Sequence, residues 1–448
     1  MRKIRNSNIP TDSKFLLISI YLQQFLKLIF IDTYRNKLKL IAIILLVSIL
    51  HLGVSISFAQ VSTDPNFKVA FIGDAGSGNN ATNVLNLIKS EGAQAMVHQG
   101  DFDYSFNATA FWGKIDSVLG SNFPYFVSVG NHDAASWNEG CGDADGCYAK
   151  FQKDRLARIG VVPDSPDLND QLYSATFKGL KMVFIGLAGN SAGASVYSPY
   201  IQSQLQSDSH TWKVCSWHKN QTNMQLGTKA DEMGWNVYEM CRQQGAIIAT
   251  GHEHTYERTK TLTNIQGLTV DTTQHPLVGG VPGNQNSLLV APGKTFVFVS
   301  GLGGNGPRNQ DRCIPFTYPY GGGVGCNYIW ASVYTTDQGG SSPFGALFIT
   351  FNVDGNPNKA RGYFKTVAGQ VVDQFEIAKS STPVTGQPTP TPTPQGPTAT
   401  PIRTPTPGGP TVTRTPTPGG PTATRTPTPG TGTPTPTPKP GMCTYWKN

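Results

Sequence analysis

The sequence predicts an α/β domain in which helices cover mixed β-sheets, and two observations predict it. Between residues 68 and 249, short apolar runs of strand length alternate with longer helical segments, and the strand starts recur at about 30 residues, the length of a βαβ unit. From residue 260 to 378 the chain is instead rich in strand-like runs. Together the two patterns favour one layered domain of roughly 315 residues.

The elements follow in chain order. The apolar run at 68–72 reads as a buried strand, and the longer segment after it as a helix. By the same criteria strands are predicted at 95–99, 125–129, 172–177, 181–187, 212–216 and 246–249, the pair at 172–187 forming a hairpin. Helices are predicted at 81–91, 108–119, 199–207 and 230–244. The last strands are predicted at 268–271, 295–300, 346–351 and 362–366.

Residues 1–59 have the composition of a targeting leader. Three basic residues precede an apolar run at 40–50, and the small residues Ser57 and Ala59 precede Gln60 as in a cleavage site. This order predicts a signal peptide, and the alternative is an uncleaved membrane anchor with its basic end in the cytoplasm. Either interpretation places the rest of the chain outside the cytoplasm, secreted or at the cell surface.

Residues 381–440 form a Thr/Pro-rich low-complexity linker. They hold 19 of the 33 prolines and repeat Arg-Thr-Pro-Thr-Pro-Gly every 11 residues from 403. Such a chain is extended and disordered, since it cannot bury a core. Residues 441–448 remain as a short C-terminal stub. The linker is similar to those that join secreted bacterial enzymes to a second module, so cell-wall or carbohydrate association is one expected role. The catalytic domain is therefore predicted at 60–380.

The net charge of +7 belongs to the ends of the chain. Residues 60–380 hold 22 Lys and Arg against 26 Asp and Glu. A mildly acidic middle gives no support for nucleic acid as a structural partner and suits cations better.

Seven cysteines fit an oxidising compartment. Six are near neighbours in sequence, which suggests the pairs Cys141–Cys147, Cys215–Cys241 and Cys313–Cys326. Cys215 and Cys241 could instead be buried thiols. Cys443 is left over.

Five short polar segments carry the chemistry, and each directly follows a predicted strand. They are Gly73-Asp74-Ala75-Gly76, Gly100-Asp101-Phe102-Asp103-Tyr104, Gly130-Asn131-His132-Asp133, Trp217-His218 and Gly251-His252-Glu253-His254. The carboxyl ends of strands meet at one edge of an open α/β sheet, so these side chains should gather there. Carboxylate, carboxamide, imidazole and phenol ligands suit Fe, Zn and Mn. There are too many ligands for one tetrahedral ion, which favours two metals about 3.5–4 Å apart.

These segments resemble the calcineurin-like metallophosphoesterase superfamily over residues 68–378. Gly100-Asp101-x-x-Tyr104 and Gly251-His252-x-His254-x-Tyr256-Glu257-Arg258 are similar to the purple acid phosphatase branch. The resemblance implies a four-layer αββα sandwich. It also implies that Asp74, Asp101, Tyr104 and His254 hold Fe(III), and that Asp101, Asn131, His218 and His252 hold Fe(II), Zn or Mn. Asp101 would bridge the two ions, and His132 would protonate the leaving group or orient the phosphate.

Other polar residues near these motifs have open roles. Asp103, Asp133, Glu253 and Glu257 are candidates for hydrogen bonds to a ligand. Arg258 could contact the substrate phosphate or pair with Glu257, while Lys219 and Asn220 could meet the phosphate. His98 is expected in the core. The inserts at 134–170 and 302–344 are expected to wall the substrate cleft.

The leading interpretation is an exported phosphatase that hydrolyses small phosphate monoesters by attack of a metal-bound hydroxide. A phosphodiesterase or nucleotidase with the same site is the first alternative. A cell-surface binding protein with a vestigial site is the second, and the intact ligand set argues against it.

Overall fold

The computed structural model describes residues 60–137, 147–164, 171–187 and 193–380. The predicted leader, linker and stub lie outside the described residues, as does Cys141. Within these ranges, every helix is too short or too polar to cross a membrane.

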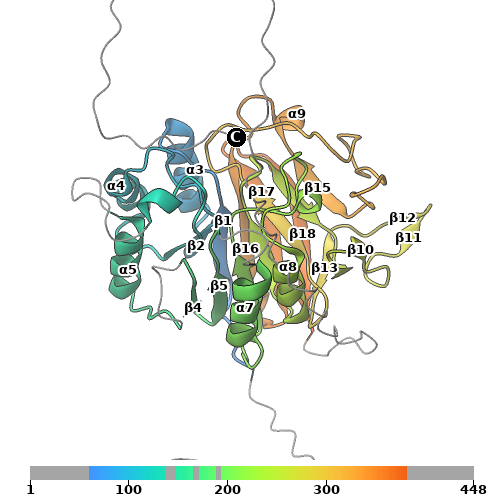
Figure 1. Cartoon of the computed structure of the whole chain (residues 1–448), viewed down its shortest axis with the longest axis horizontal. Coiled ribbons are helices and arrows are strands. Elements are labelled where there is room, and N and C mark those ends of the chain that lie inside the picture. The colour runs from blue at the N-terminus through green and yellow to red at the C-terminus, as the bar shows by residue number, and fades with distance from the viewer. Residues whose placement is uncertain (1–59, 138–146, 165–170, 188–192, 381–448) are drawn as a thin grey trace, which may run out of the picture. The chain divides into compact units, whose positions relative to one another are not determined.

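Two seven-stranded mixed sheets form the centre of the fold (Figure 1). The first has the order β13 (Ser287–Val290), β18 (Val371–Lys379), β17 (Lys359–Thr366), β16 (Gly345–Phe351), β1 (Phe67–Ile72), β2 (Ala95–His98) and β3 (Tyr125–Val127). The second has the order β15 (Trp330–Tyr334), β8 (Tyr256–Thr259), β14 (Val297–Ser300), β7 (Ile247–Thr250), β6 (Trp212–Ser216), β5 (Leu180–Phe184) and β4 (Tyr173–Phe177). Strands β1, β2 and β3 run parallel, as do β5, β6, β7 and β14.

Aromatic side chains pack the two sheets face to face. Phe71 of β1 meets Phe298 of β14 edge-on, with 5.2 Å between the ring centroids. Tyr256 of β8 stacks on Phe364 of β17 at 4.2 Å. Such pairs add to the hydrophobic gain of the buried rings, and they fix the position of one sheet over the other.

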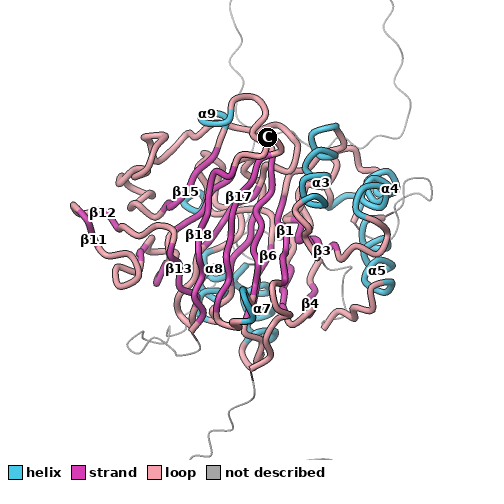
Figure 2. The backbone as a smooth tube through the Cα atoms, turned by 180° about the vertical axis from the view of Figure 1, so that it is seen from behind, coloured by secondary structure: helices cyan, strands magenta, loops and turns pink. Residues whose placement is uncertain are grey.

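Helices form the two outer layers, which confirms the predicted four-layer αββα sandwich. The helices α3 (Asn79–Ser90), α4 (Ala108–Leu119) and α5 (Tyr148–Arg158) lie beside β1, β2 and β3, and α7 (Ser198–Leu205) and α8 (Trp235–Gln243) lie on the second sheet (Figures 1 and 2). Strands β17 and β18 alternate between buried and solvent-facing residues, so the first sheet is only partly covered. A short helix, α9 (Thr336–Gly339), and the two-stranded ribbons β9 (Leu262–Asn264) with β10 (Thr269–Val270) and β11 (Leu277–Val278) with β12 (Val281–Pro282) complete the fold.

Most predicted elements are present, and two differences matter for the site. The helix predicted at 230–244 begins only at Trp235, because Oε1 of Gln221 accepts hydrogen bonds from the backbone N–H of Met233 and Gly234 and holds the preceding segment as a loop. Helix α5 was not predicted, since its apolar side is narrow and includes the buried Arg155. The insert at 134–170 is therefore partly helical.

Two of the predicted cysteine pairs are disulfides. Cys215 of β6 is bonded to Cys241 of α8, which ties the second sheet to its helical layer. Cys313 is bonded to Cys326 within the insert at 302–344. The predicted partner of Cys147 lies outside the described residues.

Candidate metal centre

The five ligand-bearing loops meet at the carboxyl ends of β1, β2, β3, β6 and β7, as predicted from the strand ends. Glycines allow the loops to approach closely. Gly100 has a φ of +85°, and a β-carbon there would lie 2.6 Å from the backbone nitrogen of Gly130 and 2.9 Å from Nδ1 of His218. A β-carbon on Gly251 would lie 2.8 Å from the carbonyl oxygen of Gln99. Larger residues at these positions would push the loops apart.

The first set of donor atoms is a triangle. Oδ1 of Asp74, the hydroxyl of Tyr104 and Nε2 of His254 lie 3.2 Å from one another in each pairing. Ligands that share one metal ion at about 2.0–2.2 Å lie at such separations from each other. These three residues could therefore hold one metal ion.

The second set lies beside the first. Oδ1 of Asp101 is 3.3 Å from Nε2 of His218, which is 3.1 Å from Nδ1 of His252. The three residues form a group whose geometry suits a metal ion. Nε2 of His218 is also 4.0 Å from Oδ1 of Asp74, so the two sets adjoin.

The far nitrogen of each imidazole faces an acceptor, and for His218 and His254 this fixes the tautomer. Nδ1 of His218 lies 2.7 Å from the carbonyl oxygen of Gln99, and Nδ1 of His254 lies 2.7 Å from that of Gly306. Nε2 of His252 lies 2.9 Å from Oε2 of Glu232. A carbonyl only accepts, so Nδ1 of His218 and Nδ1 of His254 carry the proton, and the Glu232 carboxylate stands within reach of a proton on Nε2 of His252. The nitrogens of His218 and His254 that point into the two sets thus present lone pairs, which is the state that a metal ion requires.

The carboxylates of the two sets are buried and charged. Burial alone would raise the pKa of Asp74, but the imidazoles of His254 and His218 outweigh it and lower this pKa. Burial would likewise raise the pKa of Asp101, and His218 and the backbone N–H of His132 hold it below its usual range. Burial and the charges of Asp74 and Asp101 raise the pKa of the Tyr104 phenol. This negative cluster suits cations, and a trivalent ion would favour ionised Tyr104.

The third loop places its two predicted residues differently. The side chain of Asn131 is exposed, and its role as a ligand stays a prediction. The ring of His132 is half-buried and lies 4.5 Å from the Tyr104 ring, while its backbone N–H donates to Oδ1 of Asp101 at 2.9 Å. His132 thus stands at the rim of the site with its imidazole beside a ligand of the first set.

The acidic residues next to the proposed ligands accept hydrogen bonds from backbone N–H groups, not from the side chains of those ligands. The carboxylate of Asp133 accepts from the N–H groups of Gly130, Asp101 and Phe102 at 2.7–2.8 Å, which clamps the second loop to the third. Burial and the charge of Asp101 raise the pKa of Asp133 to about 8, although these N–H donors oppose the shift. Asp103 accepts from the N–H groups of Ser105, Phe106 and Asn107 and from the Tyr148 hydroxyl.

Three predicted substrate contacts have other partners. Arg258 is buried and makes a two-pronged ion pair with Asp373 at 2.7 and 2.9 Å, so neither phosphate contact nor a pair with Glu257 describes it. Nδ2 of Asn220 donates to the carbonyl of Gly251 and thereby ties the fourth loop to the fifth. Lys219 lies 2.5 Å from Glu232. His98 is in the core, as predicted, against the Tyr125 hydroxyl at 2.8 Å.

Glu257 and Glu253 also differ from each other. Glu257 accepts from the N–H of Leu226 and the hydroxyl of Thr255, and burial raises its pKa to about 8. Glu253 is buried and lies 3.5 Å from Arg308 and 3.8 Å from Lys229. Arg308 belongs to the insert at 302–344, whose Gly306 carbonyl holds His254, so this insert does line the site.

The sequence reasoning missed the partners that orient the imidazoles. Gln99 and Gly306 act through backbone carbonyls, which no residue type reveals. Glu232 could have been found as an acid a short way after His218, but the predicted helix at 230–244 placed it on a helical surface.

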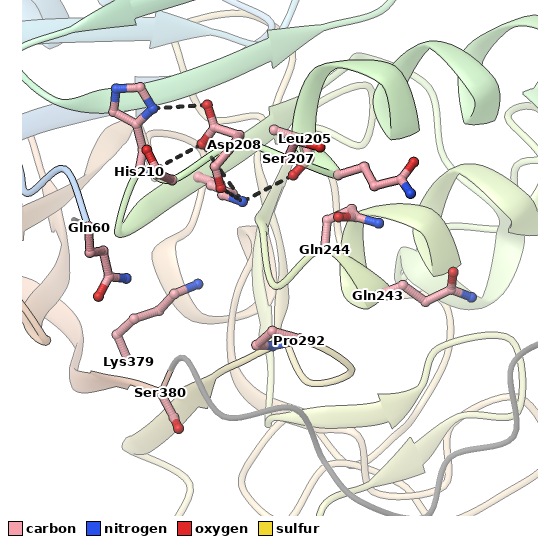
Figure 3. A pocket seen from close by; sticks show the side chains of 13 residues that line it. Gln60, Leu205, Ser207, Asp208, His210, Gln243, Gln244, Pro292, Lys379 and Ser380 are labelled. Carbon is pink, nitrogen blue, oxygen red and sulfur yellow. Dashed lines mark hydrogen bonds and ion pairs between the residues drawn. The ribbon is translucent and has the colours of Figure 1, made fainter. Parts of the chain in front are cut away.

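A large cavity of about 750 Å³ lies elsewhere, at the amino ends of β6, β7 and β14 (Figure 3). Its lining includes Lys213 and Lys379, and Asp208 there pairs with His210 at 2.9 Å. None of the predicted ligands lines it. This cavity is therefore separate from the donor cluster described above.

Residues 67–256 match the family model described as calcineurin-like phosphoesterase. The match runs from the first residue of β1 to the first residue of β8 and so contains all five loops. It confirms the resemblance that the motifs predicted, and the enzyme class of that family is the metal-dependent phosphoester hydrolases. A search of curated proteins finds no match to this sequence.

One solved structure shows a similar fold. A purple acid phosphatase from yellow lupin (Lupinus luteus) seeds superposes with a TM-score of 0.50 at 15% identity, over 74% of this chain and 58% of that one. The chain thus spans less than two thirds of that phosphatase. PhoD superposes with a TM-score of 0.42 at 12% identity, over 73% of this chain and 74% of that one.

Proposed function

We propose that this chain, whose residues 67–256 match the calcineurin-like phosphoesterase model, is an exported enzyme that hydrolyses small phosphate monoesters with two metal ions. The observation that carries the proposal is the pair of adjoining donor sets. Each set joins a carboxylate to at least one imidazole whose lone pair points inward.

The proposed ligands follow from the two sets. Asp74, Tyr104 and His254 would hold the first ion, and Asp101, His218 and His252 the second. Asp101 is proposed to bridge, and Asn131 to complete the second set. When bound, the two ions would polarise the phosphoryl oxygens and make a water molecule acidic enough to react at neutral pH.

The protein residues would then divide the remaining work. The hard phenolate and carboxylates of the first set favour Fe(III), and the imidazoles of the second favour a divalent Fe, Zn or Mn ion. His132 stands at the rim and is proposed to give a proton to the leaving oxygen. Asp133 and the glycines keep the loops in register during this step.

Export is supported by the two disulfides, which persist in oxidising compartments. The domain bounds at 60–380 and the choice between a cleaved leader and an anchor remain part of the proposal.

The rates of hydrolysis of two substrates by the purified full chain test the proposal. p-Nitrophenyl phosphate and bis(p-nitrophenyl) phosphate would be compared with metals supplied, from acid to neutral pH. Faster hydrolysis of the monoester supports the proposal. Faster hydrolysis of the diester would replace it by the phosphodiesterase reading, and no hydrolysis of either would leave a binding protein.

A further inference from the structure

The loop at 229–232 holds His252 from two sides. Nζ of Lys229 donates a hydrogen bond to the carbonyl oxygen of His252, and the carboxylate of Glu232 faces Nε2 of the same residue at 2.9 Å. His252 has a φ of +71°, in the left-handed region that residues other than glycine rarely adopt. Contacts at both its backbone and its ring therefore keep this residue in an otherwise unfavoured position.

Glu232 is itself fixed. Its Oε1 lies 2.5 Å from Nζ of Lys219, and its backbone N–H donates to the carbonyl of Asn220 at 3.1 Å. Both partners directly follow His218, which belongs to the same donor set as His252. One oxygen of the Glu232 side chain thus faces an ammonium group that can only donate, and the other faces the imidazole.

Glu232 is also unlike the partners of the other two imidazoles. His218 and His254 donate to backbone carbonyls, whereas Nε2 of His252 lies 2.9 Å from a side-chain carboxylate oxygen. Partners of metal-ligating histidines raise the basicity of the ring and set its tautomer, and their loss typically weakens metal binding about 10–100-fold.

We infer that Glu232 is a positioning residue that keeps the proton of His252 on Nε2 and thereby sets the affinity of the second site for a divalent ion. The inference rests on the proposed function for the existence of that site. Lys219, which the sequence suggested as a phosphate contact, instead determines which way Glu232 is oriented.

The amide variant gives the sharpest test. In Glu232→Gln, Lys219 should keep the amide oxygen, so the NH₂ group would face Nε2 of His252 and donate to it. That arrangement moves the imidazole proton to Nδ1, where it blocks metal binding. In Glu232→Ala the imidazole can bond to water and choose either tautomer. We therefore expect Glu232→Gln to bind the second metal ion more weakly than Glu232→Ala does. If Glu232 served only in packing, the order of the two affinities would be reversed.

The experiment measures Zn²⁺ affinity and stoichiometry by chelator competition on the metal-free full chain, with circular dichroism as the folding control. We expect two ions on the unaltered chain. Glu232→Gln should retain one and bind the other about 10–100-fold or more weakly. The affinity of Glu232→Ala for the second ion should lie between those of the unaltered chain and of Glu232→Gln. Asp231→Asn, the same chemical change one residue away, at an acid that accepts from Thr222, should bind both ions normally.

A double variant keeps the test decisive if the amide variant is unstable. Without Lys219 the amide can turn its oxygen toward His252, so Lys219→Met combined with Glu232→Gln should bind the second ion more tightly than Glu232→Gln alone. Normal affinity in Glu232→Gln, weaker binding by alanine than by the amide, or no rescue would each overturn the inference. An unaltered chain that binds fewer than two ions would instead overturn the proposed function, and the inference with it.

Discussion

Nε2 of His218 and Nδ1 of His252 lie 3.1 Å apart, while Nδ1 of His218 faces the carbonyl of Gln99 and Nε2 of His252 faces the Glu232 carboxylate. Two facing lone pairs repel each other, and Oδ1 of Asp101 adds a negative charge at 3.3 Å from the first. A cation between them, or a proton on one of the two facing nitrogens, relieves this arrangement. In its absence burial lowers the pKa of His218, but the charges of Asp101 and Asp74 prevail and raise it to about 9.

His132→Ala separates proton transfer from metal binding. His132 touches the site only at its rim, so the variant should bind the same number of metal ions. The loss of a general acid should slow hydrolysis of p-nitrophenyl phosphate by about 10²–10⁴-fold. His210→Ala, which changes a histidine at the opposite end of the sheets, should leave kcat unaltered (Figure 3). Normal turnover by His132→Ala would refute the assignment.

Tyr104→Phe tests the first ion through its colour. A phenolate bound to Fe(III) absorbs visible light by charge transfer, and the Tyr104 hydroxyl is 3.2 Å from both Asp74 and His254. The iron-loaded variant should be colourless. Tyr318→Phe, whose hydroxyl donates to the carbonyl of Pro282 and not to a proposed ligand, should keep the colour. A coloured Tyr104→Phe protein would place the iron elsewhere.

Much of the centre could be predicted because its ligands stand at strand ends beside glycine, where local sequence carries the signal. Arg258 could not be placed, since its partner Asp373 lies 115 residues away on β18, a strand that the pattern did not predict. The contact of Glu232 with His252 was not predicted, for a different reason. Its segment has the composition of a helix, but Gln221 captures the N–H groups that would begin that helix. Tertiary hydrogen bonds overrode local preference at both positions.

Asp373→Ala should strongly destabilise the domain. It would leave the guanidinium of Arg258 buried without its carboxylate, and breaking a buried pair typically costs about 3–5 kcal/mol. Tyr256 would also lose the acceptor of its hydroxyl, which lies 2.6 Å away. Urea unfolding measures the loss. The pair Arg361 and Glu376 is exposed, so Glu376→Ala should change the free energy of unfolding little.

Acid should destabilise the protein partly through His275. This residue is buried, its Nε2 accepts from the N–H of Thr261 at 2.9 Å, and burial lowers its pKa to about 4. The folded pKa lies below the unfolded value of about 6.5, so the stabilisation is complete above pH 6.5 and is lost as the pH falls towards 4. The contribution is on the order of 3 kcal/mol. Urea unfolding between pH 7 and pH 4 should show a shallower decline in His275→Gln, and an equal decline would contradict this assignment.

A metal titration of the full chain tests the central claim most directly. Metal-free protein would receive Zn²⁺ or Mn²⁺ in steps, with bound metal and the rate of p-nitrophenyl phosphate hydrolysis measured at each step. Because the two donor sets adjoin and are proposed to act on one phosphoryl group, hydrolysis should rise only as the second equivalent binds. Full activity with a single bound ion, or with none, would contradict the account.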